Sequence, residues 1–291
     1  MQEILQYLFS GITSGAIYAI IAVGLCLLYN STELINFAHG EFVMLGAMGL
    51  VTLWVHCELP LPVAFVITVA GVSLFGLVFE RFAIRTVKTP DPIVLVIITV
   101  GASILMRGGA MLIWGKDPMG TPTFTDLPPL ELGGAMLLFQ SVWILLAALV
   151  LCLALHLFFT RTLRGKAMAA CAISRKAAWL AGIPAEGMIL LSFMMSTGAG
   201  AVAGIFIAPV TMSSYDMGTM LGLKGFCAAM IGGLGSLWGA LAGGFLLGIL
   251  EAMGVGLVSS GLKDAVAFLL LLLILYVRPG GLFRATEAAR F

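Results

Sequence analysis

Long apolar runs separated by short polar stretches dominate the chain. A helix that crosses a bilayer needs about 20 mostly apolar residues. Runs of about this length lie at Ile4–Tyr29, Ile93–Trp114, Ala135–Phe159 and Met188–Val210. Shorter apolar segments lie at Phe42–Val55, Pro60–Phe79, Met220–Ile231, Leu237–Met253 and Ala265–Val277. The pattern predicts an all-α, polytopic membrane helical bundle of eight or nine hydrophobic segments, including short or broken helices, in which residues 1–291 form a single domain.

The composition agrees with a membrane protein and excludes other classes. Of the 291 residues, 61% are hydrophobic and 10% are charged, whereas a soluble domain is roughly 45–50% apolar and about 25% charged. The mean hydropathy is +1.12. These values exclude a water-soluble enzyme and a disordered chain. The net charge of +1 gives no basic field of the kind that attracts nucleic acid.

The sequence lacks the motifs of cofactor, metal and catalytic sites. Its five cysteines lie far apart, and its three histidines have no metal-ligand spacing. It has no glycine-rich phosphate loop, so we do not expect ATP to bind this chain through such a motif. We therefore expect no cofactor, no metal site and no catalytic residue.

The largest polar loop, Thr160–Gly187, is basic. Basic loops of membrane proteins stay on the cytoplasmic side, so we expect this loop to share that side with two other basic clusters. The three clusters are Arg161, Arg164, Lys166, Arg175 and Lys176; Arg81, Arg85 and Lys88; and Arg278, Arg284 and Arg290. An alanine-rich run predicts a short helix from about Lys166 to Leu180. This helix either docks a soluble partner or only fixes the topology.

A polar stretch, Asn30–Glu41, interrupts the first two apolar segments. One interpretation is a surface loop made of turn and cap residues. The other is a helix break at membrane depth, which is tolerated only beside protein or a water-filled cavity and which often forms the site of a transporter. On the second interpretation Asn36, His39 and Glu41 line a translocation pathway. The side of the N-terminus depends on whether residues 42–55 cross the membrane fully.

Small residues recur at every fourth position near residue 240. One stripe holds Gly235, Gly239 and Gly243, and a second holds Ser236, Ala240, Gly244 and Gly248. Stripes of this kind let helices pack closely in lipid. We therefore predict that these glycines are helix-packing residues in a compact bundle.

Four ionisable residues stand alone in apolar surroundings. Arg107 lies near the outer end of Ile93–Trp114, where its side chain is expected to snorkel to the surface rather than find a buried partner. Asp216 and Lys224 are expected in an outer turn. Glu251 is expected near a helix end. These residues do not form the chain of carboxylates that a proton pump needs.

Three segments resemble a known family. They are Gly11–Tyr18 (GITSGAIY), Ile35–Gly46 (INFAHGEFVMLG) and Ile231–Gly244 (IGGLGSLWGALAGG), and a fourth similarity lies at Arg278–Phe283 (RPGGLF). They resemble the Liv-type permeases, the membrane subunits of ATP-driven ABC importers for branched-chain amino acids. The resemblance extends from Gly11 to about Phe283.

The resemblance implies the remaining parts of an importer. A second related permease chain, two cytoplasmic ATPase subunits and a periplasmic substrate-binding protein would be the partners, in a bacterial inner membrane. The loop at about 160–187 looks like the family's ATPase-docking segment, with Lys176-Ala177-Ala178 and Gly182 resembling the EAA-x3-G pattern; Lys here replaces Glu. The implied docking residues are Arg161, Arg164, Lys166, Lys176, Ala177, Ala178 and Gly182.

Two other functions compete with the branched-chain amino acid importer. A permease for urea or short amides carries similar sequence runs. A secondary transporter or channel, a different class of protein, would work without ATPase partners and would need a coupling-ion site within the spans. The sequence alone does not separate these functions.

Overall fold

Helices form almost all of the chain. The computed structural model describes residues 2–87, 91–132, 134–257, 261, 263–278 and 280–283. Among these residues, six helices are long and apolar enough to cross a membrane. They are α1 (Gln2–Thr32), α3 (Leu61–Phe79) extended by a π-helical turn, Glu80–Ile84, α4 (Pro92–Trp114), α5 (Phe139–Arg161), α8 (Ala185–Ile207) and α10 (Leu237–Leu257). This confirms the polytopic helical bundle.

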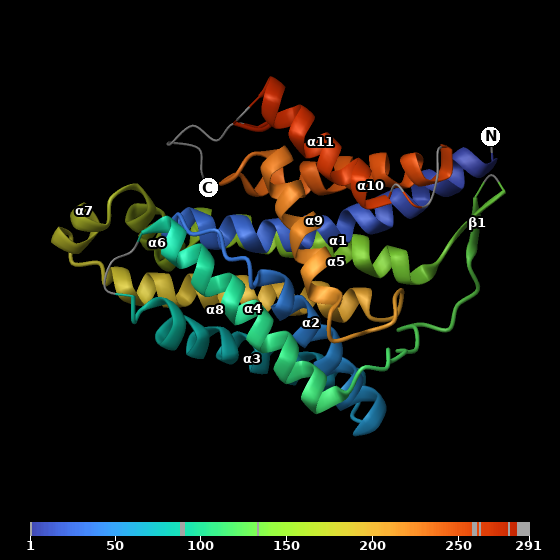
Figure 1. The fold of residues 1–291 in the computed structure, drawn as a ribbon, viewed down its shortest axis with the longest axis horizontal. Coiled ribbons are helices and arrows are strands. Elements are labelled where there is room, and N and C mark those ends of the chain that lie inside the picture. Colours follow the sequence, from blue (N-terminus) through green and yellow to red (C-terminus); the bar gives the residue numbers. More distant parts are fainter. Residues whose placement is uncertain are drawn as a thin grey trace.

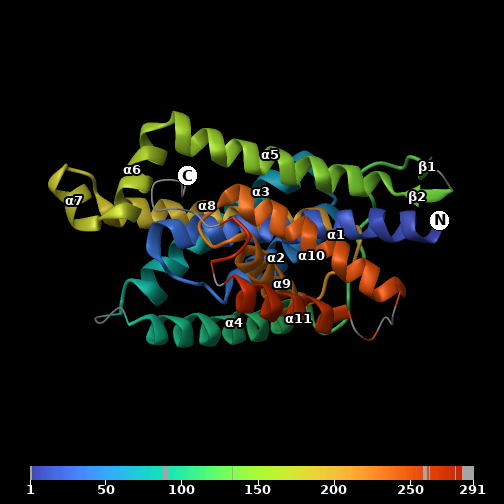
Figure 2. The same cartoon turned by 90° about the horizontal axis from the view of Figure 1, so that it is seen from above.

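Shorter elements complete the fold. They are α2 (His39–Leu50) extended by a π-helical turn, Val51–His56, α6 (Leu163–Ile173), α7 (Arg175–Leu180), α9 (Met217–Gly232), α11 (Lys263–Val277) and the antiparallel strands β1 (Leu130–Leu132) and β2 (Ala135–Leu137). The α6 and α7 helices lie at one end of the molecule, and the N-terminus and the hairpin lie at the other (Figures 1 and 2).

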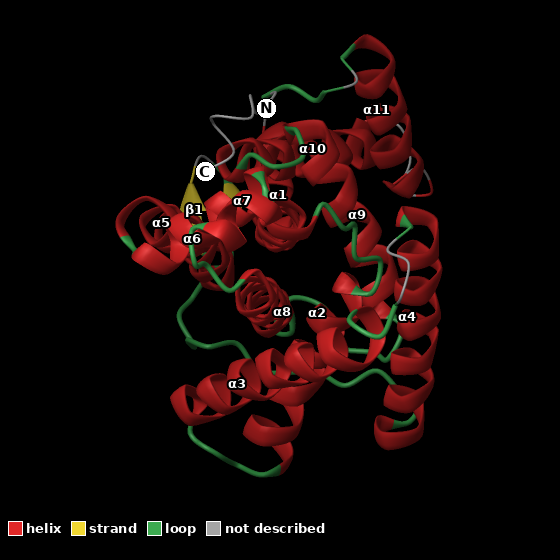
Figure 3. Cartoon of the chain, turned by 90° about the vertical axis from the view of Figure 1, so that its left-hand side faces the viewer, coloured by secondary structure: helices red, strands yellow, loops and turns green. Residues whose placement is uncertain are grey.

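The first helix is the centre of the bundle. Most of α1 from Gly11 onward is buried, and it packs against α5, α8, α9 and α10. A Cβ added to Gly248 of α10 would lie 2.3 Å from the backbone nitrogen of Gly15. The backbones of α1 and α10 are therefore in direct contact, as small residues permit in lipid. Figure 3 looks along the bundle and shows α8 almost end-on.

Most of the polar stretch Asn30–Glu41 packs against the bundle, although Glu33 is exposed. The chain leaves α1 at Thr32 and re-enters a helix at His39. The new helix begins against α9, because a Cβ on Gly40 would lie 2.0 Å from the carbonyl oxygen of Gly218. The stretch thus separates α1 from α2, and its second half is largely buried, which favours the helix break over the surface loop.

The structure corrects three predicted boundaries. The expected helix from Lys166 to Leu180 is two helices, because Ser174 is extended and its hydroxyl caps α7 by accepting from the amide of Ala177 at 3.2 Å. The expected span from Ala135 begins later, because its first residues pair in the hairpin that turns at Gly134, where φ is +85°. The expected segment Met220–Ile231 is longer, because α9 runs from Met217 to Gly232. Its 16 residues span about 24 Å, and the helix crosses α1 steeply in Figure 1.

Basic residues gather at the α6–α7 end. Arg85, which follows α3, forms an ion pair with Glu186 of α8. The segment 280–283 packs at the turn that follows α9, where Phe283 donates its amide hydrogen to the carbonyl of Gly232. Lys88, Arg284 and Arg290 lie outside the described residues.

Candidate functional site

Asn36 occupies the non-helical part of the break. Its Oδ1 accepts a hydrogen bond from the amide of Ala38 at 3.0 Å, which turns the chain into α2. The side chain is buried, and its Nδ2 has no hydrogen-bond partner among the described residues. A buried amide nitrogen without a partner is expensive. The atom is therefore free to donate to a solute or a water.

His39 opens α2 in a space made by glycines. Its Nδ1 lies 3.4 Å from the Oγ of Ser196, and that hydroxyl donates to the carbonyl of Gly24 at 2.8 Å. Because the hydroxyl hydrogen is used, we assign the ring hydrogen to Nδ1, which leaves Nε2 as an acceptor. No described residue bonds Nε2. A Cβ on Gly24 would lie 2.9 Å from the imidazole, so this glycine makes room for it.

Glu41 joins three helices at one carboxylate. Its Oε1 accepts from Ser103 of α4 at 2.8 Å and from Thr219 of α9 at 3.2 Å. The Nε of Arg107 lies 3.6 Å from the same oxygen. Glu41 is 1% exposed, and its other oxygen has no partner among the described residues. Buried charges in a membrane are costly and usually mark functional sites.

A cavity of about 220 Å³ adjoins these residues. Its polar lining comes from Asn36, His39, Ser103, Arg107 and Thr219. Its apolar walls include Leu25, Phe37, Val100, Ile104, Leu223 and Phe226. The cavity lies between the helix break, α4 and α9. A mostly apolar cavity with a few converging polar groups is the usual form of a small-molecule site.

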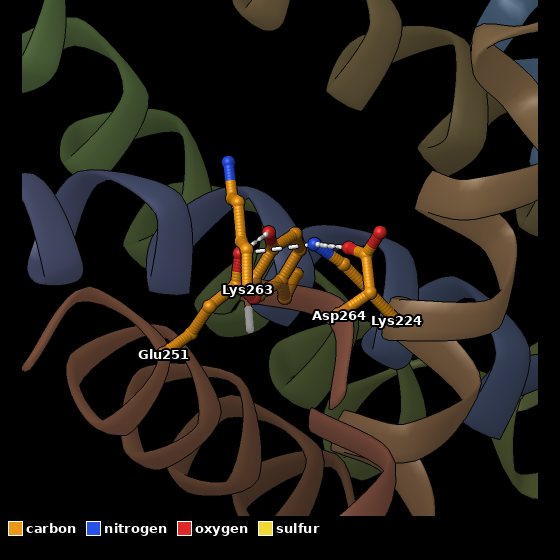
Figure 4. Close-up of polar contacts among 5 residues, drawn as sticks. Lys224, Glu251, Lys263 and Asp264 are labelled. Carbon is orange, nitrogen blue, oxygen red and sulfur yellow. Dashed lines mark hydrogen bonds and ion pairs between the residues drawn. The ribbon is translucent and has the colours of Figure 1, made fainter. Parts of the chain in front are cut away.

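A second buried polar cluster joins α1, α9, α10 and α11 (Figure 4). The Nζ of Lys224 lies 2.9 Å from Glu251 and 2.8 Å from Asp264. The hydroxyl of Tyr18 in α1 donates to the same oxygen of Glu251 at 3.1 Å, and the Nζ of Lys263 lies 3.6 Å from it. Lys224 and Glu251 are almost fully buried, whereas Asp264 and Lys263 are half exposed. The cluster ties four helices together.

Two of the isolated ionisable residues are not where the sequence suggested. Lys224 lies inside α9 and not in an outer turn. Glu251, in the last two turns of α10, is buried and pairs with Lys224. Arg107 lines a cavity and has the buried Glu41 as an ion-pair partner, whereas the sequence predicted a side chain that snorkels to the surface without a buried partner. Pairing across helices leaves no periodic signal, although an apolar segment with a single charge indicates that a partner exists.

The loop at about 160–187 forms an exposed tip. Thr162 caps α6 by accepting from the amide of Gly165 at 3.0 Å, and Gly182, with φ of +80°, ends α7. The side chains of Arg161, Arg164, Lys166 and Lys176 are exposed, as is Ala177, whereas Ala178 is buried. Four large apolar side chains are also exposed there: Leu163, Ile173, Trp179 and Leu180. The tip thus presents an apolar and basic surface.

The glycines near residue 240 face two different helices. Gly239 and Gly243 approach α9, and Gly244 and Gly248 approach α1. Gly235 lies before α10 rather than within it. Its φ is +98°, and its carbonyl accepts from the Nδ2 of Asn30 at 2.8 Å. It serves the turn between α9 and α10, so the helical stripe begins at Gly239.

Sequence comparisons agree on one family. A family model described as "Branched-chain amino acid transport system / permease component" matches residues 7–275. The high-affinity branched-chain amino acid transport system permease protein BraD of Pseudomonas aeruginosa is 33% identical over 299 residues, covering 98% of this chain and 97% of the relative. The corresponding protein LivH of Escherichia coli K12 is 33% identical over 304 residues, with the same coverage. LivH of Salmonella typhimurium is 32% identical over 304 residues.

Proposed function

Because the chain belongs to the family of branched-chain amino acid transport permease components, we propose that it forms half of the membrane pathway of an ATP-driven importer for branched-chain or related small amino acids. The observation that carries this proposal is the buried polar break with its adjoining cavity. Asn36, His39 and Glu41 place polar atoms without partners deep inside an otherwise apolar bundle. Broken helices of this kind are where transporters bind their substrates.

The partners follow from the family and from the exposed tip. A second related permease chain completes the pathway, and two cytoplasmic ATPase subunits supply the energy. The α6–α7 tip docks one ATPase subunit through its basic residues, Arg161, Arg164, Lys166 and Lys176, and through the Ala177–Gly182 turn. Exposed apolar side chains such as Trp179 support this role, since large aromatic residues anchor protein interfaces. A periplasmic binding protein delivers the solute at the opposite end.

The orientation follows from the basic residues. The tip and the residues that follow α11 are cytoplasmic, in a bacterial inner membrane. Since α1 starts at the end opposite the tip (Figure 1), the N-terminus is on the periplasmic side. ATP binding then acts at the tip and shifts the helices around the cavity, which requires the ATP-bound state to favour one conformation over the other.

Co-purification tests the proposal. The tagged chain is extracted in mild detergent from its native host, and its partners are identified by mass spectrometry. We expect two ATPase subunits and a second permease. A chain found alone, or only with copies of itself, would refute the importer and favour a secondary transporter or channel.

A matched pair of variants tests the docking surface. Gly182→Trp places a bulky side chain at the tip and should reduce ATPase co-purification while membrane insertion is kept. Gly115→Trp is the control, because Gly115 follows α4 rather than the tip, has a similar φ of +82° and has an equally open surrounding. Normal recovery of the ATPase subunits with Gly182→Trp would contradict the docking assignment.

A further inference from the structure

We propose that Arg107 is the group that binds the carboxylate of the solute in the cavity beside Glu41, with the apolar body of the solute against the cavity walls. That the bound solute is the transported one rests on the proposed function. The binding of a carboxylate rests on the structure of this chain alone.

Arg107 is placed as a binding residue would be. It lines the cavity, and about a third of its side chain is exposed. Among the described residues its one charged partner is Glu41, at 3.6 Å through Nε, and it donates no hydrogen bond. A guanidinium carries five N–H donors in a planar fork that matches a carboxylate. Its terminal donors are therefore available to a ligand.

Glu41 acts as a positioning residue. Its Oε1 is held by Ser103 and Thr219, so the carboxylate has a fixed place between α4 and α9. The ion pair with Arg107 holds the guanidinium at the cavity, where an isolated charge would be costly. Ser103 and Thr219 also line the cavity, so with Arg107 they form part of its polar side.

The cavity fits a small amphipathic anion. A cavity of about 220 Å³ is at the small end of ligand pockets, which measure roughly 300–1,000 Å³, and this suits a molecule of the size of valine or leucine. The remaining walls are aliphatic and aromatic: Leu25, Phe37, Val100, Ile104, Leu223 and Phe226. A branched aliphatic acid can place its carboxylate against Arg107 and its apolar body against these walls. A neutral amide or urea would leave the guanidinium without a counter-charge beyond Glu41.

Thiol labelling tests the proposal on the purified chain. Leu223→Cys puts a thiol on the wall, in a Cys57→Ser background because Cys57 is the exposed cysteine and the other four are buried. The probes are anionic sulfonatoethyl and cationic trimethylammonioethyl methanethiosulfonate. We expect the anionic reagent to have about a tenfold advantage over the cationic one, relative to their rates with a free thiol, because a charged cleft concentrates opposite charge.

Protection by ligands identifies the recognised group. Isocaproate and leucine should slow the labelling, whereas isocaproamide, a neutral molecule of the same shape, should not. Arg107→Gln should abolish both the charge preference and the protection by isocaproate. Arg107→Lys should keep part of the charge preference but protect less, because lysine lacks the planar fork.

Clear outcomes would overturn the proposal. Equal protection by isocaproate and isocaproamide would do so, as would an unchanged charge preference in Arg107→Gln. Because Arg107→Gln leaves Glu41 buried without its counter-charge, the double variant Arg107→Gln/Glu41→Gln removes both charges and should fold normally but show neither effect. Protection that persists in this folded double variant would also refute the assignment. A chain that protects as expected but co-purifies without ATPase subunits would keep the carboxylate site and refute the importer.

Discussion

Replacing Lys224 with Met should destabilise the protein more than any exposed lysine substitution. The change keeps the length of the side chain and removes its charge. It breaks the contacts of Nζ with Glu251 at 2.9 Å and with Asp264 at 2.8 Å. Asp264 is half exposed and can be solvated, so the cost falls on the buried Glu251. Among the described residues, Glu251 then keeps Tyr18 and the more distant Lys263 as partners.

The size of the effect follows from the geometry. Two charges 2.9 Å apart attract by about 6 kcal/mol at an effective dielectric constant of about 20. The cost of burying both charges cancels much of this attraction, but removing one partner of a buried pair typically costs about 3–5 kcal/mol because the other charge stays buried. Lys263 compensates in part, so we expect about 3 kcal/mol, or a fall in Tm of roughly 6 °C or more.

Thermal unfolding in detergent measures this loss. The melting of the purified chain is followed by circular dichroism for Lys224→Met, Glu251→Met and the double variant. Lys116→Met is the matched control, because Lys116 is exposed and exposed substitutions stay within about 0.5 kcal/mol.

The double variant tests whether Lys224 and Glu251 stabilise the protein as a pair. Replacing both partners by apolar residues is often neutral, so Lys224→Met/Glu251→Met should melt closer to the parent than Lys224→Met does. If the effects of the two single changes simply add, the two residues are not coupled. The buried ion pair would then not be what ties α9 to α10.

Two further predictions concern the pathway and the packing. His39→Leu should strongly reduce amino acid uptake in cells without loss of the complex, because it removes the acceptor at Nε2, whereas exposed His56→Leu should leave uptake normal; unchanged uptake with His39→Leu would return the break to a purely structural role. Gly248→Val should prevent stable folding, because its Cβ would overlap the backbone of Gly15, whereas Gly109→Val, with open space around it, should be recovered from the membrane at parental levels. Equal recovery of the two glycine variants would contradict the close approach of α1 and α10.

The sequence predicted the long spans well. The apolar run Ile93–Trp114 predicts a span, and α4 covers Pro92–Trp114. Transfer from water to lipid depends on summed hydrophobicity, which a single sequence contains. Helix breaks are also visible when polar residues gather, as at Asn30–Glu41. The sequence does not show whether such a polar stretch is buried, because the same residues also suit a surface loop.

The sequence could not predict which charges meet. Lys224 and Glu251 lie on different helices, and their contact depends on how α9 crosses α10. Arg107 could face lipid, surface or cavity with the same local sequence. The break between α6 and α7 had a readable signal, since Ser174 is a good N-cap residue, but the surrounding alanines favour a continuous helix.

The lysine in α9 has a consequence for how the chain enters the bilayer. A lysine near the centre of a membrane helix costs about 2.5–3.5 kcal/mol during insertion, and α9 is too short to repay this with added apolar length. Both of its anionic partners are synthesised later, in α10 and α11. The α9 helix should therefore remain at the translocation channel until these helices follow, so that α9, α10 and α11 insert as one unit. A ribosome-bound chain that ends before α10 is expected to leave α9 outside the lipid.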